Sequence, residues 1–259
     1  MSSEFEIDLP FLIDVARDAG AQILDVYRSD FDVEHKQDES PLTEADLRAH
    51  RLITARLAER YPNTPILSEE SSDKAAYEVR RDWKRYWLVD PLDGTKEFVK
   101  RNGQFTVNIA LIEDGRPVAG VVYAPEIEWL YYGSPEGAYK VEGVGEPVRL
   151  APRAATDSKL LRVVGSLSHP SPEVEKFVEE QRQHYEKVEF IAMGSSLKLC
   201  IVAEGKADIY PRFGPTMEWD TAAAHAVVSA SGRRVIAHGT NEDLPYNKEN
   251  LLNGWFVVQ

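Results

Sequence analysis

The segment Trp87–Phe98, WLVDPLDGTKEF, joins an apolar run to a pair of carboxylates. The run predicts a buried strand, and Asp90 and Asp93 follow it three residues apart, ahead of Gly94-Thr95 at the start of a predicted helix. A few carboxylates together with water and a substrate phosphate suit Mg²⁺, and backbone N–H groups at a helix N-terminus can receive a phosphate oxygen. An ordinary surface turn is the alternative, because Asp-Pro and Asp-Gly are favoured there, although charged residues rarely follow a buried strand without a partner.

The composition excludes several classes of protein. The chain has 259 residues, with 43 acidic side chains against 30 of Lys and Arg, and a formal net charge of −13. Such a balance gives no long-range attraction for a phosphate backbone, which argues against a nucleic-acid-binding groove. Hydrophobic residues make up 43% of the chain, a share typical of a globular protein rather than a disordered one.

Cysteine content and apolar windows predict a cytoplasmic protein. Cys200 is the single cysteine, so neither an intramolecular disulfide nor a cysteine-based zinc cluster can form. No window approaches the roughly 20 apolar residues of a membrane span, and no basic segment precedes the first apolar stretch as in a secretory signal. We therefore expect no integral membrane segment, while peripheral attachment to the inner membrane stays open.

Residues 1–150 predict an N-terminal α+β half. Apolar spacing near 3.6 predicts a helix over 9–27, and Thr43 and Asp46, at capping-box spacing, begin a second helix that Pro62 ends. Short strands are expected at 65–67 and 86–89. Four more apolar runs, separated by Gly- and Pro-containing turns, predict an antiparallel meander over 106–112, 117–123, 129–132 and 138–141.

Residues 151–259 predict a C-terminal α/β half, after a segment rich in Gly and Pro at 143–152. Strands alternate with helices there, as in an α/β unit. The predicted strands are 161–164, 188–191 and 207–210, and the predicted helices are 172–184, 196–204 and 221–231. Together the two halves predict a layered fold.

Three further acidic positions stand beside predicted elements. Glu69, with its neighbour Glu70, follows an apolar strand, where a solvated loop is the alternative. Asp220 precedes a helical run and could be only its N-cap. Asp46 could be only the first-turn acid of its own helix. Each signal is weak alone.

In combination and in this order, these elements resemble the inositol monophosphatase superfamily of lithium-sensitive, Mg²⁺-dependent phosphatases. The likeness extends from the first helix to about Val235 and implies the αβαβα layered fold of the sugar phosphatases. Within the superfamily, the bacterial 3′(2′),5′-bisphosphate nucleotidases of sulfur assimilation and nucleotide recycling look most similar, on 87–108, 194–198 and 210–216. The matching elements are Asp46, Leu67-Ser68-Glu69-Glu70, Asp90-Pro91-Leu92-Asp93-Gly94-Thr95 and Trp219-Asp220-Thr221-Ala222-Ala223.

The resemblance implies a site for two to three Mg²⁺ ions, with Li⁺ as an inhibitor. The cations would neutralise the phosphate, lower the pKa of a water molecule and stabilise the leaving oxygen. Thr95 and Asp46 would orient or deprotonate that water, without a covalent phosphoenzyme. The implied ligands are Glu69, Asp90 and the Leu92 carbonyl for one ion, Asp90, Asp93 and Asp220 for a second, and Glu69 with water for a weaker third.

Substrate choice is expected to depend on the second half of the chain. Arg212 stands where the inositol phosphatases of the superfamily carry an acidic residue suited to sugar hydroxyls. A guanidinium binds a phosphate bidentately and a carboxylate does not, so this position favours a substrate with a second phosphate. The expected partner is therefore a small phosphorylated nucleotide, adenosine 3′,5′-bisphosphate, hydrolysed to AMP and phosphate, with 3′-phosphoadenylyl sulfate as a second substrate.

A second group of residues, Gly194 to Lys198, could form an anion cradle at the start of a helix. An ordinary N-cap and a solvated lysine are the alternative. The resemblance leaves a homodimer open. The full set of expected substrate contacts is Glu69, Leu92, Asp93, Gly94, Thr95, Gly194, Ser195, Ser196, Lys198, Arg212 and Asp220.

Other readings of the motifs fit less well. An inositol 1-monophosphatase or a sugar bisphosphatase of the same superfamily is the main alternative. Phosphatases of the haloacid-dehalogenase type use an aspartyl nucleophile in Asp-x-Asp, whereas the two aspartates here are three residues apart. A dinucleotide-binding loop would need a third glycine after Gly143-x-Gly145. A non-catalytic, Mg²⁺-bound regulator is the remote alternative.

Overall fold

A seven-stranded sheet in the order β3-β4-β5-β6-β7-β8-β9 lies at the centre of the computed structural model, which describes residues 6–29, 34–35, 41–71, 74–151, 159–166 and 171–259. β3 is parallel to β4, and the other neighbours are antiparallel, which confirms the predicted meander. The strands are β3 (Ile66–Ser68), β4 (Arg85–Asp93), β5 (Thr106–Glu113), β6 (Arg116–Ala124), β7 (Trp129–Ser134), β8 (Gly137–Glu142) and β9 (Val148–Leu150). The sequence predicts a Gly- and Pro-rich boundary over 143–152, but β9 lies within that segment. The strand forms there because it pairs with β8 and buries Leu150.

Alternation along the strands gives the sheet two buried faces. Trp87 and Val89 of β4 pack with α1 (Leu9–Tyr27) and α2 (Glu44–Arg60), whereas Tyr86 and Leu88 belong to the core on the opposite face. Successive side chains of a strand point to opposite faces, so this division follows from the strand period of two. Both N-terminal helices and the Thr43–Asp46 capping box are confirmed.

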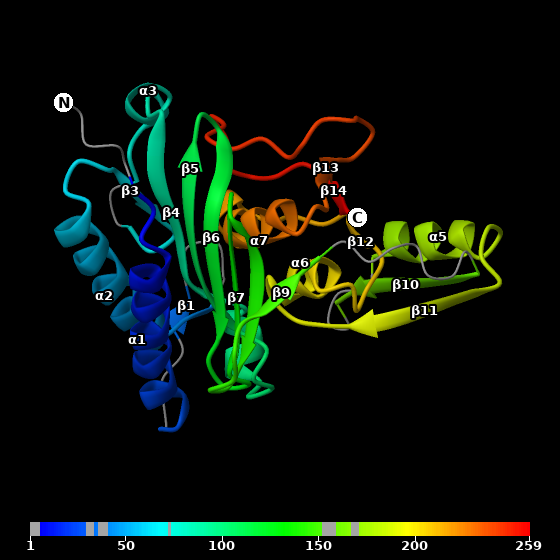
Figure 1. Ribbon diagram of the computed structural model, residues 1–259, viewed down its shortest axis with the longest axis horizontal. Coiled ribbons are helices and arrows are strands. Elements are labelled where there is room, and N and C mark those ends of the chain that lie inside the picture. Colours follow the sequence, from blue (N-terminus) through cyan, green and yellow to red (C-terminus); the bar gives the residue numbers. More distant parts are fainter. Residues whose placement is uncertain (1–5, 30–33, 36–40, 72–73, 152–158, 167–170) are drawn as a thin grey trace.

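The second face of the sheet is covered by α6 (Leu197–Ala203) and α7 (Glu218–Ala230) (Figure 1). The closeness of α7 depends on small residues in the sheet. A Cβ atom on Gly133 would lie only 2.8 Å from Cα of Val227, so a side chain there would push the helix outward. Because α7 belongs to the second half of the chain and packs on the sheet of the first, the division near residue 150 stays a prediction.

The fold has five layers in the order helix, sheet, helix, sheet and helix (Figure 1). Two small sheets form the fourth layer, and α5 (Pro172–Gln181) forms the fifth. The predicted alternation of strand, helix and strand is confirmed, with β10 (Leu160–Gly165) and β11 (Lys187–Ala192) paired in parallel beside α5. A three-stranded sheet has the order β12-β14-β13, with β12 at Tyr210–Arg212, β13 at Val235–Ala237 and β14 at Phe256–Val258. The shorter elements are β1 (Glu34–His35), β2 (Pro41–Leu42), α3 (Tyr77–Arg80) and α4 (Thr95–Val99).

The predicted strand over 207–210 was placed too early. The strand β12 begins at Tyr210, and before it Ile209 makes only an isolated bridge with Val163. The Asp208 carboxylate instead pairs with the guanidinium of Arg162 at 3.0 Å. Among the described residues, no helix is both long and apolar enough to cross a bilayer.

Candidate active site

An irregular register in β4 brings two carboxylates to the same cavity. Asp90 lies opposite Asn108 and Asp93 opposite Thr106, so three steps along β4 match two along β5. In a regular strand, residues three apart point to opposite faces, and an extra residue re-aims the second side chain. The sequence predicts a strand that ends at Val89, whereas the strand continues to Asp93 with this bulge.

Three acidic side chains from separate elements meet at this point. Glu69 directly follows β3, Asp90 lies on β4 and Asp220 lies in the first turn of α7. One carboxylate oxygen of each lies within 4.8 Å of the others, an arrangement able to hold a metal ion. We call these three residues the carboxylate trio. An oxygen-only ligand set of this kind suits a hard cation.

Burial and mutual repulsion raise the pKa of two members of the trio. The pKa of Asp90 lies well above its usual value, first because the group is buried and then because Glu69 and Asp93 are close. The pKa of Asp220 is raised in the same way, by burial and then by Asp93 and Glu69. Like charges in a low-dielectric site destabilise the ionised forms, and a bound cation would reverse that balance.

Helix starts fix the directions of Asp220 and Asp46. Each is the third residue of its helix, and its Oδ2 accepts a backbone N–H three residues earlier, from Met217 at 2.9 Å and from Thr43 at 2.8 Å. The alternative that Asp220 is only the N-cap of its helix is therefore wrong, because Met217 holds that position. The other oxygen of Asp46 accepts from the Thr95 hydroxyl at 3.4 Å, which places the predicted catalytic pair in contact.

The Thr95 side chain has a second acceptor close by. Its hydroxyl lies 3.3 Å from the Leu92 carbonyl, so one proton serves two acceptors. α4 begins at Thr95, after Gly94 with a φ of 89°, as the sequence predicts for a helix N-terminus there. A Cβ atom on Gly94 would also lie 3.2 Å from Cβ of Ser195, so glycine keeps the two sides of the site together.

The start of α6 forms the opposite wall. The Ser196 N–H donates to Asp93 Oδ2 at 2.5 Å, and the Gly194 N–H donates to Gln104 Oε1 at 2.6 Å, so both groups have protein acceptors. Lys198 is 7% exposed, and burial lowers its pKa to about 8, although the nearby Asp93 carboxylate opposes the shift. The cationic character of this wall therefore comes from the Lys198 side chain.

Arg212, from β12, lies across the same cavity. One terminal nitrogen donates to the Pro215 carbonyl at 2.8 Å. Its Nε is buried and donates to no acceptor among the described residues. A buried donor without a partner is uncommon in a native structure and is consistent with a ligand that is to be bound there.

All predicted site residues except Asp46 line one cavity of about 390 Å³, and Asp46 contacts Thr95 in its wall. Sequence reasoning missed Lys96, Ser166 and Tyr210 in the same lining. Lys96 stood inside the quoted motif as the residue after Thr95, and its charge was the available signal. Tyr210 stood in the stretch 210–216 that carries the resemblance, whereas nothing in the local sequence marks Ser166.

A second and larger cavity, of about 1250 Å³, adjoins the first. The two share part of their walls, namely Lys96, Ser166, Tyr210, Arg212 and Pro215. The second also has an apolar wall, formed by Pro172, Val174, Val178, Phe190 and Phe213. A ligand that extends through both cavities would place a charged group in the smaller cavity and a flat or apolar group against the apolar wall of the larger one.

Known proteins share both the sequence and this architecture. The family model "Inositol monophosphatase family" matches residues 7–254. The 3′(2′),5′-bisphosphate nucleotidase CysQ of Salmonella typhimurium is 48% identical over 94% of this chain and 96% of its own. The crystal structure of CysQ from Bacteroides thetaiotaomicron superposes with a TM-score of 0.86 at 45% identity, covering 99% of this chain and 98% of that one. An inositol monophosphatase from Anabaena, at 21% identity, shares the fold with a TM-score of 0.70, over 97% of this chain and 89% of its own. The chain therefore belongs to the inositol monophosphatase family.

Proposed function

We propose that this protein is a metal-dependent phosphatase that hydrolyses the 3′-phosphate of adenosine 3′,5′-bisphosphate to AMP and phosphate. The observation that carries the proposal is one cavity in which the carboxylate trio faces the cations Lys198 and Arg212. A relative 48% identical over 94% of this chain is named as a 3′(2′),5′-bisphosphate nucleotidase. The single cysteine fits the reducing cytoplasm, the compartment that we propose.

The donor set fits a metal ion and favours Mg²⁺. Asp90 is buried among like charges that raise its pKa, and such repulsion is relieved when a divalent cation binds. We propose two to three Mg²⁺ ions, held by Glu69, Asp90, Asp93, Asp220 and the Leu92 carbonyl, with Li⁺ as an inhibitor. When bound, the cations supply charge stabilisation for the phosphate and the leaving oxygen.

Thr95 and Asp46 are suited to orient the attacking water. The Thr95 hydroxyl donates its proton to Asp46 Oδ1 and to the Leu92 carbonyl, so the lone pairs of the Thr95 oxygen remain available to accept a hydrogen bond from water. Asp46 Oδ2 accepts from the Thr43 N–H and hydroxyl at 2.8 and 2.6 Å, which fixes the carboxylate. We propose that this pair positions the water, and that Asp46 Oδ1 receives its proton through Thr95.

The second phosphate and the nucleoside would occupy the far side of the site. The Nε of Arg212, which has no acceptor among the residues that the structure describes, can donate to a phosphate that is not cleaved. The adjoining 1250 Å³ cavity offers an apolar wall to a base, whereas inositol 1-phosphate has neither a base nor a second phosphate. 3′-Phosphoadenylyl sulfate carries the same 3′-phosphate and is proposed as a second substrate.

A phosphate-release panel tests the proposal. Purified protein is assayed with Mg²⁺ on adenosine 3′,5′-bisphosphate, 3′-phosphoadenylyl sulfate, inositol 1-phosphate and fructose 1,6-bisphosphate, each with and without Li⁺. We expect the highest kcat/KM on the bisphosphate nucleotide, inhibition by Li⁺ and no turnover with a chelator. Faster turnover of inositol 1-phosphate or of the sugar bisphosphate would refute the substrate choice and leave the metal site intact.

A further inference from the structure

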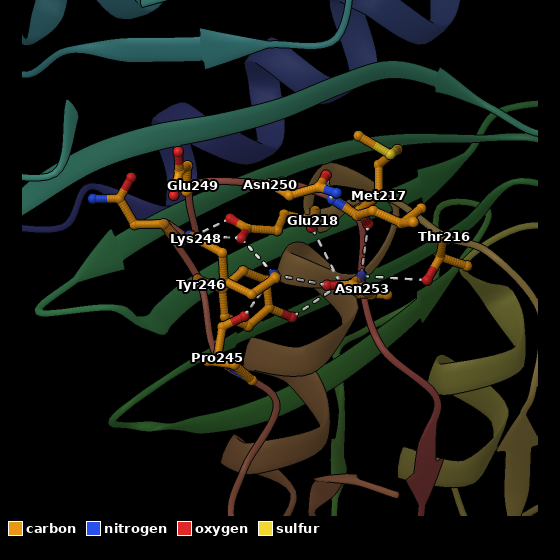
Figure 2. Close-up of polar contacts among 12 residues, drawn as sticks. Thr216, Met217, Glu218, Pro245, Tyr246, Lys248, Glu249, Asn250 and Asn253 are labelled. Carbon is orange, nitrogen blue, oxygen red and sulfur yellow. Dashed lines mark hydrogen bonds and ion pairs between the residues drawn. The ribbon is translucent and has the colours of Figure 1, made fainter. Parts of the chain in front are cut away.

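A buried polar network holds a C-terminal segment against the first turn of α7 (Figure 2). Glu218, the first residue of α7, is completely buried. Its Oε2 accepts the Asn247 N–H at 2.8 Å, and its Oε1 accepts the Lys248 N–H at 3.0 Å and the Lys248 ammonium at 2.5 Å. We call residues 245–253, together with this carboxylate, the C-terminal clamp.

Asn253 closes the other end of the clamp. Its Nδ2 donates to the Met217 carbonyl at 2.9 Å and to the Thr221 hydroxyl at 3.2 Å, while its Oδ1 accepts from Lys248 Nζ at 3.2 Å. Backbone bonds run beside these contacts, from the Glu218 N–H to the Leu251 carbonyl at 3.0 Å among others. The clamp therefore holds the turn that carries Asp220 through both side-chain and backbone bonds.

The clamp also reaches the part of the chain that follows Glu69. Arg80, at the end of α3, donates to Asn247 Oδ1 at 3.0 Å and to the Glu249 carbonyl at 2.7 Å. Asn247 Nδ2 returns a bond to the Arg80 carbonyl at 2.7 Å. One segment thus contacts both α7, which carries Asp220, and α3, which follows Glu69.

The metal site needs such a support, because its acidic groups repel one another. Carboxylate oxygens of Glu69, Asp90 and Asp220 lie within 4.8 Å of one another. That repulsion acts to separate the first turn of α7 from the sheet. Glu218 does not line the cavity, so it can resist the repulsion without adding its own charge to the ligand set.

We infer that Glu218 is a positioning residue, which acts through the clamp to hold Asp220 at a metal-binding distance from Glu69 and Asp90. This inference rests on the metal site of the proposed function. Groups behind metal ligands control ligand orientation, and their loss weakens metal binding even though they never touch the ion. A purely structural ion pair would stabilise the fold without affecting metal affinity.

Glu218→Gln tests this role, with Mg²⁺ alone as the probe. The substitution keeps the side chain's size but turns one acceptor into a donor that faces a backbone N–H. We expect isothermal titration calorimetry on substrate-free protein to show Mg²⁺ affinity reduced roughly tenfold, the lower end for groups behind metal ligands. At saturating Mg²⁺, the KM for the nucleotide should change little.

Two matched controls separate positioning from general destabilisation. Ile23→Val removes a buried methylene from α1 and should lower Tm without changing Mg²⁺ affinity. Asp243→Asn removes the negative charge from the exposed pair with Arg234 in the same C-terminal region and should change neither quantity. If Glu218→Gln lowers Tm but binds Mg²⁺ as tightly as Ile23→Val does, the positioning role is wrong.

A second variant keeps the test decisive if Glu218→Gln does not fold. Lys248→Met leaves the carboxylate and both of its backbone donors in place, and should reduce Mg²⁺ affinity relative to wild type. Unchanged affinity in folded Lys248→Met would then overturn the inference. A wild-type protein that binds no Mg²⁺ would instead refute the proposed metal site, so the two failures are distinguishable.

Discussion

Asp90 links the fold to the chemistry at the scale of a single residue. It is 1% exposed, it stands at the start of the bulge in β4, and burial with nearby acidic groups raises its pKa. Such a carboxylate destabilises the metal-free protein when it is ionised, and it becomes favourable only with a cation beside it. Its position therefore makes sense as a ligand rather than as part of a surface turn.

Asp90→Asn should abolish most of the activity. The amide cannot supply the anionic oxygen shared by two proposed ions, so we expect kcat/KM on adenosine 3′,5′-bisphosphate to fall by about 1000-fold, or ~4 kcal/mol of transition-state stabilisation. The measurement is phosphate release at saturating Mg²⁺, with circular dichroism to verify folding. Turnover within tenfold of wild type would contradict the assigned role.

Arg212→Ala should alter specificity rather than catalysis. Loss of a charge-assisted contact to the phosphate that is not cleaved should cost about 3 kcal/mol, or roughly 100-fold in kcat/KM, on adenosine 3′,5′-bisphosphate. Adenosine 3′-monophosphate lacks that group and should be hydrolysed almost as well by the variant as by wild type. An equal loss on both substrates would place Arg212 on the phosphate that is cleaved.

Several site residues could be predicted because they lie close together in one sequence motif. Asp90, Asp93, Gly94 and Thr95 lie within six residues, and all line the cavity. Glu218 escaped notice although it is only two residues from Asp220. Its partners, Asn247 and Lys248, are about 30 residues away, and no local pattern encodes a contact at that distance.

The spacing of apolar residues predicted the long helices and strands, but it did not predict the shortest strands. The helix over 9–27 has a repeated apolar face, and its observed bounds are Leu9–Tyr27. β13 and β14 have three residues each, too few to show alternation, and they form by pairing, with β14 between β12 and β13. The bulge in β4 also depends on a partner strand, which local sequence does not name.

The burial of Lys198 on α6 predicts a pH dependence of substrate binding. Because its pKa is lowered to about 8, the ammonium loses its proton, and with it the attraction for phosphate, as pH rises through that value. The second phosphate ionisation, near pH 6, is already complete there. KM for the bisphosphate should therefore rise above pH 8 in wild type and stay nearly flat in Lys198→Arg. The same rise in Lys198→Arg would assign the effect to another group.

The whole molecule has more acidic than basic side chains, and some of the acidic side chains lie together in the candidate active site. The chain has a net charge of −13. Four of its acidic side chains, the carboxylate trio and Asp93, line one cavity together with the cationic Lys198 and Arg212. Bound cations would reverse the local field and admit a small anion. The overall charge therefore argues against extended polyanions but not against a phosphate ester.

The raised pKa values of Asp90 and Asp220 predict the stability of the metal-free protein. The folded state retains protons that the unfolded state releases above pH about 4, so the free energy of unfolding should fall as pH rises toward the folded-state pKa values. In chelator, Tm should decrease over that window, and the decrease should be smaller in Asp90→Asn.

Mg²⁺ should reverse that loss at neutral pH. Binding at 100 times the dissociation constant adds about 2.7 kcal/mol to the free energy of unfolding for one site. Scanning calorimetry with Mg²⁺ or with chelator, from pH 5 to 8, measures both effects. A Tm that does not respond to Mg²⁺ at pH 8 would contradict a metal site built from these carboxylates.

The identity of the bond that is cleaved tests the central claim most directly. Adenosine 3′,5′-bisphosphate is incubated with the protein and Mg²⁺, and the products are followed by ³¹P nuclear magnetic resonance. The account predicts inorganic phosphate together with AMP that retains its 5′-phosphate. Release of the 5′-phosphate, which would leave adenosine 3′-phosphate, or no release at all, would contradict it.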